Sequence, residues 1–237
     1  MKTVVVRKFD RTSKNVIDVL RVAGTATVHE AMGRVGLMKP YMRPIYPGAA
    51  ATGSAVTVLT QPGDNWMIHV GIEQCQPGDI MVVGVTADNT DGMFGELLGT
   101  SMQSRGATGL VIDAGCRDVG PLKEMGFPVW SRAISAKGTV KAVLGNVNMP
   151  VVCAGVTVHA GDVVVADDDG VVIVPRAIAD AVAKASEQRL AKESRSRERL
   201  KAGELSLDLN SMRPQLEKLG LTYVDTYEDA MKLDEAN

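Results

Sequence analysis

Short apolar runs, each preceded by a Gly-Asp pair, recur along the first 175 residues of the chain. Residues 77–83 read PGDIMVV and residues 160–165 read AGDVVV, the pattern of a tight turn that leads into a buried strand. The second run continues through three consecutive aspartates and Gly170 into another apolar run at 171–174. We therefore expect a β-hairpin there, with the aspartates in its turn rather than in a cation site.

A predicted helix at 96–105 and a predicted buried strand at 109–113 lie between these two runs. Together with the strand at 77–83 they give the order strand, helix, strand, which is typical of a βαβ unit. The sequence therefore predicts an α/β fold.

The first forty residues predict a strand at 3–7 and a helix at 14–22. Gly24 is expected to end this helix, since glycine is a common helix terminator. Thr27 is then expected to cap a second helical stretch at 29–33.

The segment 176–202 has no internal Gly or Pro and predicts one helix of about 40 Å. After Leu190 this segment is almost wholly polar, and a helix that is polar all round commonly bridges between two bodies. We therefore expect a catalytic core at 1–175 and a helical arm at 176–237 that contacts a neighbouring subunit. The alternative is a solvated surface helix. A further short helix is expected near 212–219.

Composition and charge narrow the class of protein. The 26 Lys and Arg residues balance 28 Asp and Glu residues, so the chain has no net attraction to nucleic acid or an anionic membrane. Aromatic residues make up only 4%, which disfavours stacking platforms for single-stranded nucleic acid. Three cysteines without a C-x-x-C pair argue against a disulfide framework. With no signal-peptide or membrane-span pattern in the sequence, we expect a cytoplasmic protein.

Several kinds of site are disfavoured by spacing. The histidines, His29, His69 and His159, are too scattered for a zinc site. If a metal is bound, the acidic positions favour a hard cation such as Mg²⁺ or Mn²⁺. The sequence also lacks the G-x-S-x-G elbow, the Walker loop and G-x-G-x-x-G after a strand, so serine hydrolase, nucleotidase and Rossmann interpretations are excluded.

Two segments carry the most informative polar pattern. Residues 92–100 (GMFGELLGT) form a glycine-bounded turn into the predicted helix, where backbone N–H groups can bind a carboxylate. Residues 111–118 end in Arg117 and Asp118, in a loop that leaves a buried strand, where α/β proteins commonly place their sites. The alternative is that these charges pair with other surface groups and that Gly95 only shapes a turn.

Twenty residues separate Glu96 from the Arg117-Asp118 pair. This spacing resembles the D-x20-R-D motif of the class II pyruvate aldolases, which belong to the family named for the regulator of ribonuclease activity A. Glu96 departs from that motif, because its carboxylate is one methylene longer than that of Asp. The resemblance extends over most of the chain, and its further matching segments are 27–31, 63–65, 94–98, 115–118, 127–130, 161–162, 168–175 and 202–205.

The resemblance implies a role for each motif residue. Asp118 would ligate a divalent metal directly, and Glu96 would hold metal-bound water. Arg117 would bind the pyruvyl oxygen and stabilise the enolate that forms there. The backbone amides of Leu97 and Leu98 would hold the substrate carboxylate.

A further acid is expected from the C-terminal arm of the adjacent subunit. Glu193 is the first choice, acting on the metal through water, with Glu198 and Glu204 as alternatives.

Five more residues are predicted to bind substrate, namely Gly95, Asn65, Lys141, His29 and Glu30. Lys141 is placed in a loop-to-helix stretch where it would contact a substrate carboxylate, the alternative being a surface lysine. Asn65 is expected to make a polar contact with substrate, and the alternative is that it only stabilises a turn. His29 and Glu30 are placed at the start of a helix, facing the far end of the substrate, and structural roles are equally consistent with the sequence.

The implied activity is metal-dependent retro-aldol cleavage of 4-carboxy-4-hydroxy-2-oxoadipate to pyruvate and oxaloacetate, or of 4-hydroxy-4-methyl-2-oxoglutarate to two pyruvates, in bacterial aromatic-acid catabolism. Decarboxylation of oxaloacetate would be a side activity. The implied fold is a single swivelling β/β/α-type domain with a helical C-terminal extension, assembled as a homotrimer or homohexamer. Two alternatives are a protein-binding regulator of ribonuclease activity and an enzyme that is primarily an oxaloacetate decarboxylase.

Overall fold

The computed structural model describes residues 2–235 and the side chains of residues 2–233. The chain divides into two compact units, the first ending at Leu190 and the second beginning at Ala191. Each unit is described by itself below.

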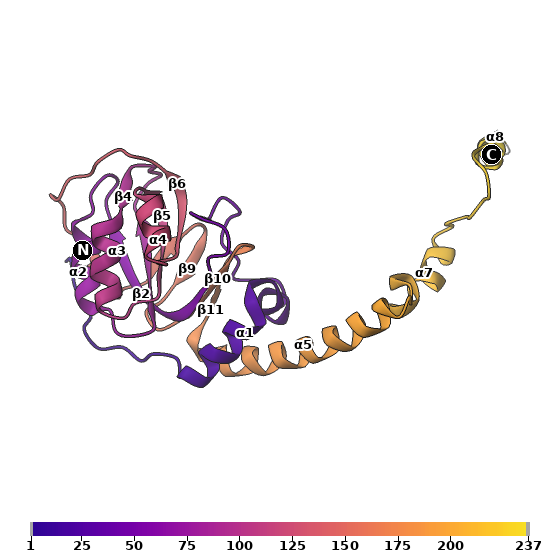
Figure 1. The fold of residues 1–237 in the computed structure, drawn as a ribbon, viewed down its shortest axis with the longest axis horizontal. Coiled ribbons are helices and arrows are strands. Elements are labelled where there is room, and N and C mark those ends of the chain that lie inside the picture. The colour runs from indigo at the N-terminus through magenta and orange to yellow at the C-terminus, as the bar shows by residue number, and fades with distance from the viewer. Residues whose placement is uncertain (1, 236–237) are drawn as a thin grey trace. The chain divides into compact units, whose positions relative to one another are not determined.

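One nine-stranded sheet forms the centre of the first unit (Figure 1). Its strands are β1 (Arg43–Pro44), β2 (Ala51–Thr60), β3 (Asp79–Val85), β4 (Gly92–Phe94), β5 (Gly109–Cys116), β6 (Val129–Ile134), β7 (Asn146–Val147), β10 (Val163–Asp167) and β11 (Gly170–Val174). Their order is β1-β6-β5-β3-β2-β10-β11, with β4 paired to β5 and β7 paired to β2. A separate antiparallel pair, β8 (Val151–Cys153) and β9 (Val156–Val158), contacts β3 through β8.

The two ends of this sheet approach each other, so the sheet is nearly closed. Arg43 in β1 donates a hydrogen bond of 2.6 Å to the carbonyl oxygen of Asp169, in the turn after β10. The indole N–H of Trp130 in β6 donates to the carbonyl oxygen of Asp167 in β10 at 2.8 Å. The α/β fold class expected from the sequence is confirmed.

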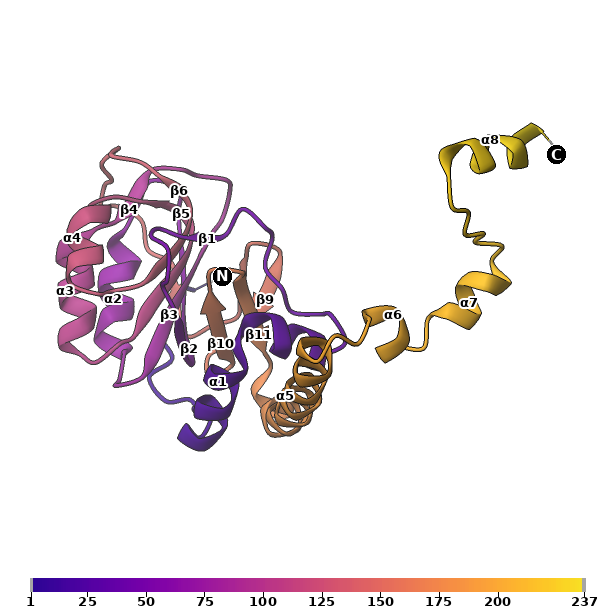
Figure 2. The ribbon, with the colours of Figure 1, turned by 45° about the vertical axis from the view of Figure 1, so that its right-hand side comes forward.

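Three helices cover one face of the parallel part of the sheet, and they lie side by side in Figure 2. They are α2 (Trp66–Gln74), α3 (Glu96–Ser104) and α4 (Val119–Glu124). Strands β3 and β5 are parallel neighbours with α3 between them in the chain, which confirms the predicted βαβ unit. The buried residues of this layer include Ile68, Leu98 and Leu122 from the helices, which pack on Met81 and Ile112 of the sheet.

Helices α1 (Lys14–Ala31) and α5 (Ala179–Lys201) cover the β10–β11 hairpin. Helix α1 is interrupted at Gly24, whose φ of 75° and ψ of 168° are not helical. The prediction that Gly24 breaks the helix is confirmed. The predicted cap at Thr27 is wrong, because the second half already begins at Thr25, whose N–H donates to the Asp167 carboxylate at 2.9 Å.

The three consecutive aspartates lie in the predicted hairpin turn, where Asp167 pairs with Gly170. The carboxylate of Asp167 accepts a hydrogen bond from the N–H of Asp169, and that of Asp168 accepts one from the N–H of Gly48 at 3.0 Å. These acids therefore bind backbone donors, as the turn interpretation predicted.

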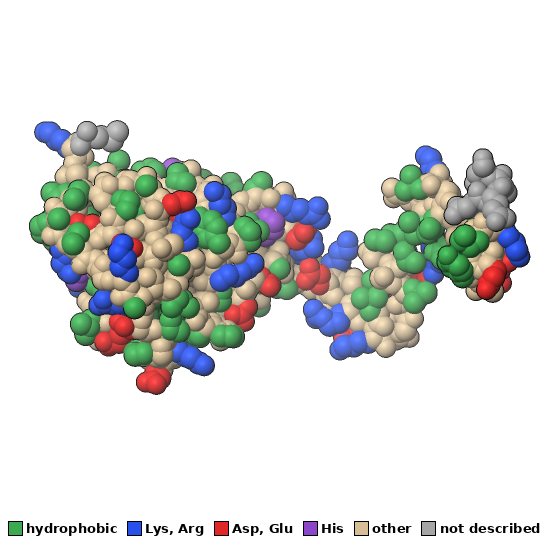
Figure 3. Space-filling view, turned by 90° about the horizontal axis from the view of Figure 1, so that it is seen from above, with side chains coloured by type: hydrophobic (Ala, Val, Ile, Leu, Met, Phe, Trp, Pro, Cys, Tyr) green, Lys and Arg blue, Asp and Glu red, His purple; other side chains and the backbone are tan. Residues whose placement is uncertain are grey.

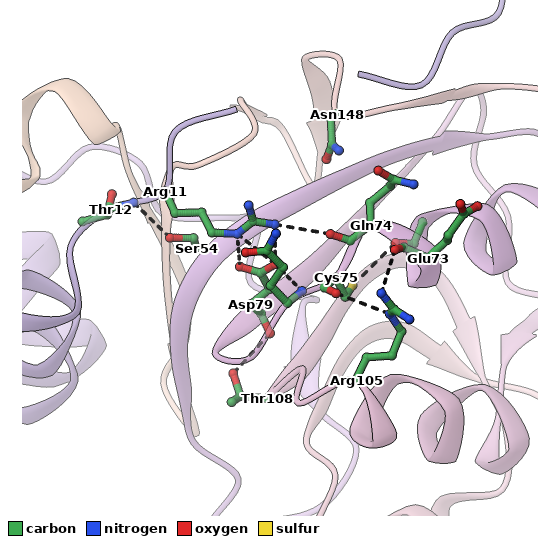
Figure 4. Close-up of polar contacts among 12 residues, drawn as sticks. Arg11, Thr12, Ser54, Glu73, Gln74, Cys75, Asp79, Arg105, Thr108 and Asn148 are labelled. Carbon is green, nitrogen blue, oxygen red and sulfur yellow. Dashed lines mark hydrogen bonds and ion pairs between the residues drawn. The ribbon is translucent and has the colours of Figure 1, made fainter. Parts of the chain in front are cut away.

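The predicted strand at 3–7 is wrong, because only an isolated bridge joins Val5 to Val147 of the two-residue strand β7. Backbone hydrogen bonds between Val4, Val6 and Val147 hold this segment beside β7. Further along the chain, the Arg11 guanidinium donates to both carboxylate oxygens of Asp79, with Nε 2.9 Å from Oδ1 and Nη2 2.8 Å from Oδ2 (Figure 4). The guanidinium also lies over the Phe9 ring, 4.2 Å from its centroid.

The long helix predicted at 176–202 is confirmed. It begins with a single 3-10 turn, η1 (Arg176–Ile178), and continues as α5. Ala179, Val182 and Ala183 are buried, so the first turns of α5 belong to the first unit.

The second unit contains the rest of α5 and then α6 (Ser206–Leu209), α7 (Arg213–Lys218) and α8 (Tyr227–Glu235). Helix α7 confirms the short helix expected near 212–219. In the part of the chain that is described, no helix combines the length and apolar character needed to cross a membrane.

Candidate functional site

A cleft of about 350 Å³ in the first unit brings together residues from α2, β4, α3, the end of β5 and the loop after β6. Seven of the predicted site residues line it, and these are Gly95, Leu97, Leu98, Arg117, Asp118, Asn65 and Lys141. The other lining residues are His69, Gly92, Met93, Phe94 and Ser101.

The Arg117–Asp118 pair is held against the start of α3. Asp118 has a left-handed backbone, with φ of 57° and ψ of 42°. Its Oδ2 accepts a hydrogen bond from the N–H of Glu96 at 3.1 Å and lies 3.5 Å from Arg117 Nε. The N–H of Arg117 donates to the carbonyl oxygen of Phe94 at 2.8 Å, so strand β4 fixes where β5 ends. Both charged side chains remain about half exposed and face the cleft.

Gly95 makes this close approach possible. A Cβ at Gly95 would lie 2.4 Å from Asp118 Oδ2 and 3.0 Å from Arg117 Cγ, closer than real Cβ contacts. The position therefore excludes any side chain as long as the pair keeps this arrangement.

The start of α3 presents backbone N–H groups to the cleft. Its first intrahelical hydrogen bond runs from Gly99 N–H to the Gly95 carbonyl oxygen, so the amides of Leu97 and Leu98 precede that ladder. A helix N-terminus of this kind binds anions, because its N–H groups and its dipole both favour negative charge.

Glu96 contributes its backbone to the site, but its carboxylate points along the helix. Glu96 Oε1 accepts a hydrogen bond from the Thr100 hydroxyl at 2.7 Å. Glu96 is absent from the residues that line the cleft as described.

Asn65, the residue that precedes α2, and His69, in the first turn of α2, line the same cleft. The Asn65 amide donates to the carbonyl oxygen of Met93 at 3.1 Å, whereas its buried Oδ1 has no hydrogen-bond partner among the described residues. Burial and then the charge of Lys141 lower the pKa of His69. Sequence reasoning missed His69 as a site residue, because no helix was expected over residues 66–74 and nothing local marks its position beside the start of α3.

The loop that carries Lys141 is not a loop-to-helix stretch, and that expectation is wrong. Residues 135–145 contain no helix, because the loop pairs with residues 63–65 rather than with itself. The N–H of Asn65 donates to the Val140 carbonyl oxygen, and the N–H of Val140 donates to that of Gly63.

His29 and Glu30 lie in the last turn of α1, so the expectation that they start a helix is wrong. The Glu30 carboxylate forms ion pairs with Arg34 at 3.0 Å and Arg189 at 3.7 Å. The structure therefore does not bring these two residues to the described cleft.

The three candidate acids of the C-terminal arm lie in the second unit. Glu193 and Glu198 are in α5, and Glu204 follows it. Glu198 pairs with Lys201 at 3.3 Å, and Glu204 forms an ion pair with Arg199.

The donor set at the cleft fits a metal that keeps most of its water. Of the described lining residues, Asp118 is the one with a carboxylate, and the described chain contains no cluster of three or more His, Cys, Asp and Glu residues arranged to hold a metal. Mg²⁺ is commonly bound by one or two carboxylates while it retains several waters. Cys116 adds no ligand, because burial and the charge of Asp118 raise the pKa of its thiol to about 12.

Comparison with known proteins places the chain in a family. The sequence model of the RraA-like family, described as Aldolase/RraA, matches residues 25–173. The chain belongs to the RraA-like family. All of the residues that line the cleft fall within the matched RraA-like segment, whereas Glu193 falls outside it.

One curated RraA-like relative, from Halalkalibacterium halodurans, is 27% identical over 86% of this chain and 94% of its own length. It bears the name "Putative 4-hydroxy-4-methyl-2-oxoglutarate aldolase". The solved structure of Streptomyces coelicolor RraAS2, described as an unusual member of the RNase ES inhibitor RraA protein family, is 26% identical, with a TM-score of 0.71 over 80% of this chain and 99% of that one. A Pseudomonas syringae pv. tomato structure is 25% identical, with a TM-score of 0.74 over 86% of this chain and all of the other.

Proposed function

We propose that this RraA-like protein is a metal-dependent lyase that cleaves 4-carboxy-4-hydroxy-2-oxoadipate to pyruvate and oxaloacetate, and 4-hydroxy-4-methyl-2-oxoglutarate to two molecules of pyruvate. The observation that carries the proposal is the Arg117–Asp118 pair held against the α3 N-terminus, where a Cβ at Gly95 would lie 2.4 Å from the Asp118 carboxylate. A cation and backbone donors thus face the same cleft as a carboxylate.

The residues of the cleft divide the recognition of a 2-oxo acid between them. The amides of Leu97 and Leu98 bind the C1 carboxylate, because both precede the intrahelical ladder. The Arg117 guanidinium binds the C2 oxygen and stabilises the negative charge that develops there. Lys141 and the unpartnered Oδ1 of Asn65 bind polar groups beyond C3.

The bond change is a retro-aldol cleavage. A base removes the proton of the C4 hydroxyl, the C3–C4 bond breaks, and its electron pair forms the enolate of pyruvate, which takes up a proton at C3. Asp118 is the residue that would hold a divalent Mg²⁺ or Mn²⁺ ion, which when bound polarises the 2-oxo group. Oxaloacetate decarboxylation passes through the same enolate and is the expected side activity.

Two parts of the proposal lie outside the cleft of one chain. We propose that the protein self-associates as a trimer or hexamer and that Glu193 of a neighbouring subunit completes the site through water. Light scattering on the purified protein tests the assembly, and a monomer would contradict the shared site.

The direct test measures pyruvate release from 4-carboxy-4-hydroxy-2-oxoadipate by wild type and Asp118→Ala, each with Mg²⁺ and with EDTA. We expect metal-dependent release by wild type and a loss of at least about 10³-fold in the variant, because the carboxylate that holds the cation is gone. Release that is equal in both proteins would contradict the assigned role of Asp118.

The second candidate is a protein-binding regulator of ribonuclease activity, which is favoured by the likeness to Streptomyces coelicolor RraAS2. A binding surface has no need of the Asp118 carboxylate beside Arg117. If wild type releases no pyruvate but binds a ribonuclease, and Asp118→Ala binds equally well, the regulator interpretation replaces the lyase.

A further inference from the structure

The carboxylate of Asp64 is buried, with 1% of the residue exposed, and it accepts hydrogen bonds from three backbone N–H groups. Oδ1 accepts from the N–H of Trp66 at 2.9 Å. Oδ2 accepts from the N–H groups of Ala142 at 2.7 Å and Val143 at 2.8 Å. Burial alone would raise the pKa of Asp64, but these three donors, with the charge of Lys141, hold it below its usual value.

These hydrogen bonds join two segments that are almost eighty residues apart in the chain. One is the segment that leads into α2, with Asn65 just before the helix and His69 in its first turn, and the other is the loop that carries Lys141. All three side chains line the cleft. The buried Asp64 carboxylate therefore connects the backbone next to Asn65 and His69 with the backbone next to Lys141.

Packing of apolar side chains does little to fix the loop. Val140 is 61% exposed, Val143 is 47% exposed and Leu144 is 54% exposed. Residues 135–145 also contain no helix. The position of the loop therefore depends on hydrogen bonds, and Asp64 accepts two of them from the residues directly after Lys141.

We propose that Asp64 is a positioning residue that holds Lys141 at the cleft and thereby sets the affinity for the substrate carboxylate beyond C3. This inference rests on the proposed lyase function and on the contact between Lys141 and substrate. Asp64 acts through the loop backbone and does not touch substrate. Lys141 has a long flexible side chain, so its ammonium reaches a defined point only if its backbone is fixed.

Replacing Asp64 by Asn breaks the arrangement with little change of shape. The Asn side chain has one acceptor oxygen and one NH₂ group, so it cannot accept at both positions that the carboxylate now occupies. Either the bond to Trp66 or the two bonds to the loop are lost. Asp64→Ser, whose hydroxyl still accepts one N–H, is the second variant if Asp64→Asn does not yield folded protein.

A double-mutant cycle with Asp64→Asn and Lys141→Ala tests the proposal in the full-length, Mg²⁺-loaded protein. We expect Asp64→Asn to lower kcat/KM for 4-carboxy-4-hydroxy-2-oxoadipate by about 10-fold to 100-fold, mainly through KM. In the Lys141→Ala background the same change should cost less than about twofold, because the group that Asp64 positions is already absent. Lys137→Met serves as the matched control, since it changes the same loop at a residue paired with Asp91 and outside the cleft.

The outcomes separate this inference from the proposed function. Fold losses that multiply in the double variant would overturn the role of Asp64, because it would then act independently of Lys141. A normal KM in both folded Asp64 variants, or an equal rise in KM for Lys137→Met, would overturn it as well. No turnover by wild type would instead overturn the lyase function on which the inference rests.

Discussion

The cleft of the first unit and the helices of the second unit fix their charged side chains in different ways. Asp118 in the cleft and the buried Asp64 beside it accept hydrogen bonds from backbone donors 22 and 78 residues away. In the second unit, the Asp208–Arg213 pair joins residues only five apart, and both side chains are nearly half exposed. Long-range backbone bonds place a side chain relative to the whole sheet, whereas a local pair places it only relative to its own turn.

The core shows the same contrast. The first unit buries three clusters of apolar side chains around its sheet. Apolar residues of the second unit remain exposed within the described chain, among them Leu219 at 76% and Tyr223 at 70%. Figure 3 shows acidic and basic side chains interspersed on the displayed face of the first unit, in keeping with a nearly neutral chain. The packed core of the first unit can therefore hold the cleft residues in place, whereas the described residues of the second unit form no buried apolar cluster of their own.

The largest expected effect comes from breaking the contact between the two charged residues and the start of α3. The Cβ that Gly95→Ala adds would lie 2.4 Å from Asp118 Oδ2 and 3.0 Å from Arg117 Cγ. Both side chains must therefore shift. We expect kcat/KM for pyruvate release to fall by about 10³-fold, because both groups leave their positions. Gly138→Ala, in the loop that carries Lys141, is the matched control, since a Cβ there meets nothing within 4 Å. Equal activity in the two variants would argue against the site.

A smaller effect is expected when the cost of removing an apolar side chain is compared between the two units. Leu122 in α4 is fully buried and packs in the first core cluster, so Leu122→Ala should lower the free energy of unfolding by about 2–5 kcal/mol. Leu219→Ala removes a side chain that is 76% exposed and should change it by less than about 0.5 kcal/mol. Urea unfolding followed by circular dichroism measures both. A large loss for Leu219→Ala would show that this residue is covered in the assembled protein.

The smallest effect concerns pH. Burial and the charge of Lys141 lower the pKa of His69 in the folded protein below its unfolded value near 6.5. The unfolded chain then binds more protons there, so folding stability is complete above pH 6.5 and decreases as the pH falls below it. Tm of wild type should fall more between pH 7.5 and pH 5.5 than Tm of His69→Gln. His29 and His159 are present in both proteins and cancel in this comparison. Parallel Tm curves would contradict the lowered pKa.

Local patterns predicted much of the fold because local chemistry determines it. The Gly-Asp turns precede buried strands, the aspartate run forms a hairpin turn, and Gly24 breaks α1 with a positive φ. The Arg117–Asp118 pair and the start of α3 were also predicted, since both stand at strand and helix ends that the apolar pattern marks.

The errors arose where distant parts of the chain decide the local structure. Thr27 is not a cap because the Asp167 carboxylate, 142 residues from Thr25, starts that half of α1. The loop around Lys141 is not helical because it bonds to Asp64 and its neighbours. His69 was missed because only the fold shows that α2 lies beside the start of α3. A single sequence carries no direct signal for such long-range partners.

The left-handed backbone of Asp118 has a consequence for mutational scanning of this position. Asn, Asp and Gly tolerate positive φ far better than β-branched residues do. In a library of all substitutions at position 118, a screen for folded protein would therefore select residues that tolerate positive φ. A screen for turnover would select residues that keep the negative charge. Asn should pass the first screen and fail the second, which makes Asp118→Asn the substitution that separates the shape of this residue from its charge.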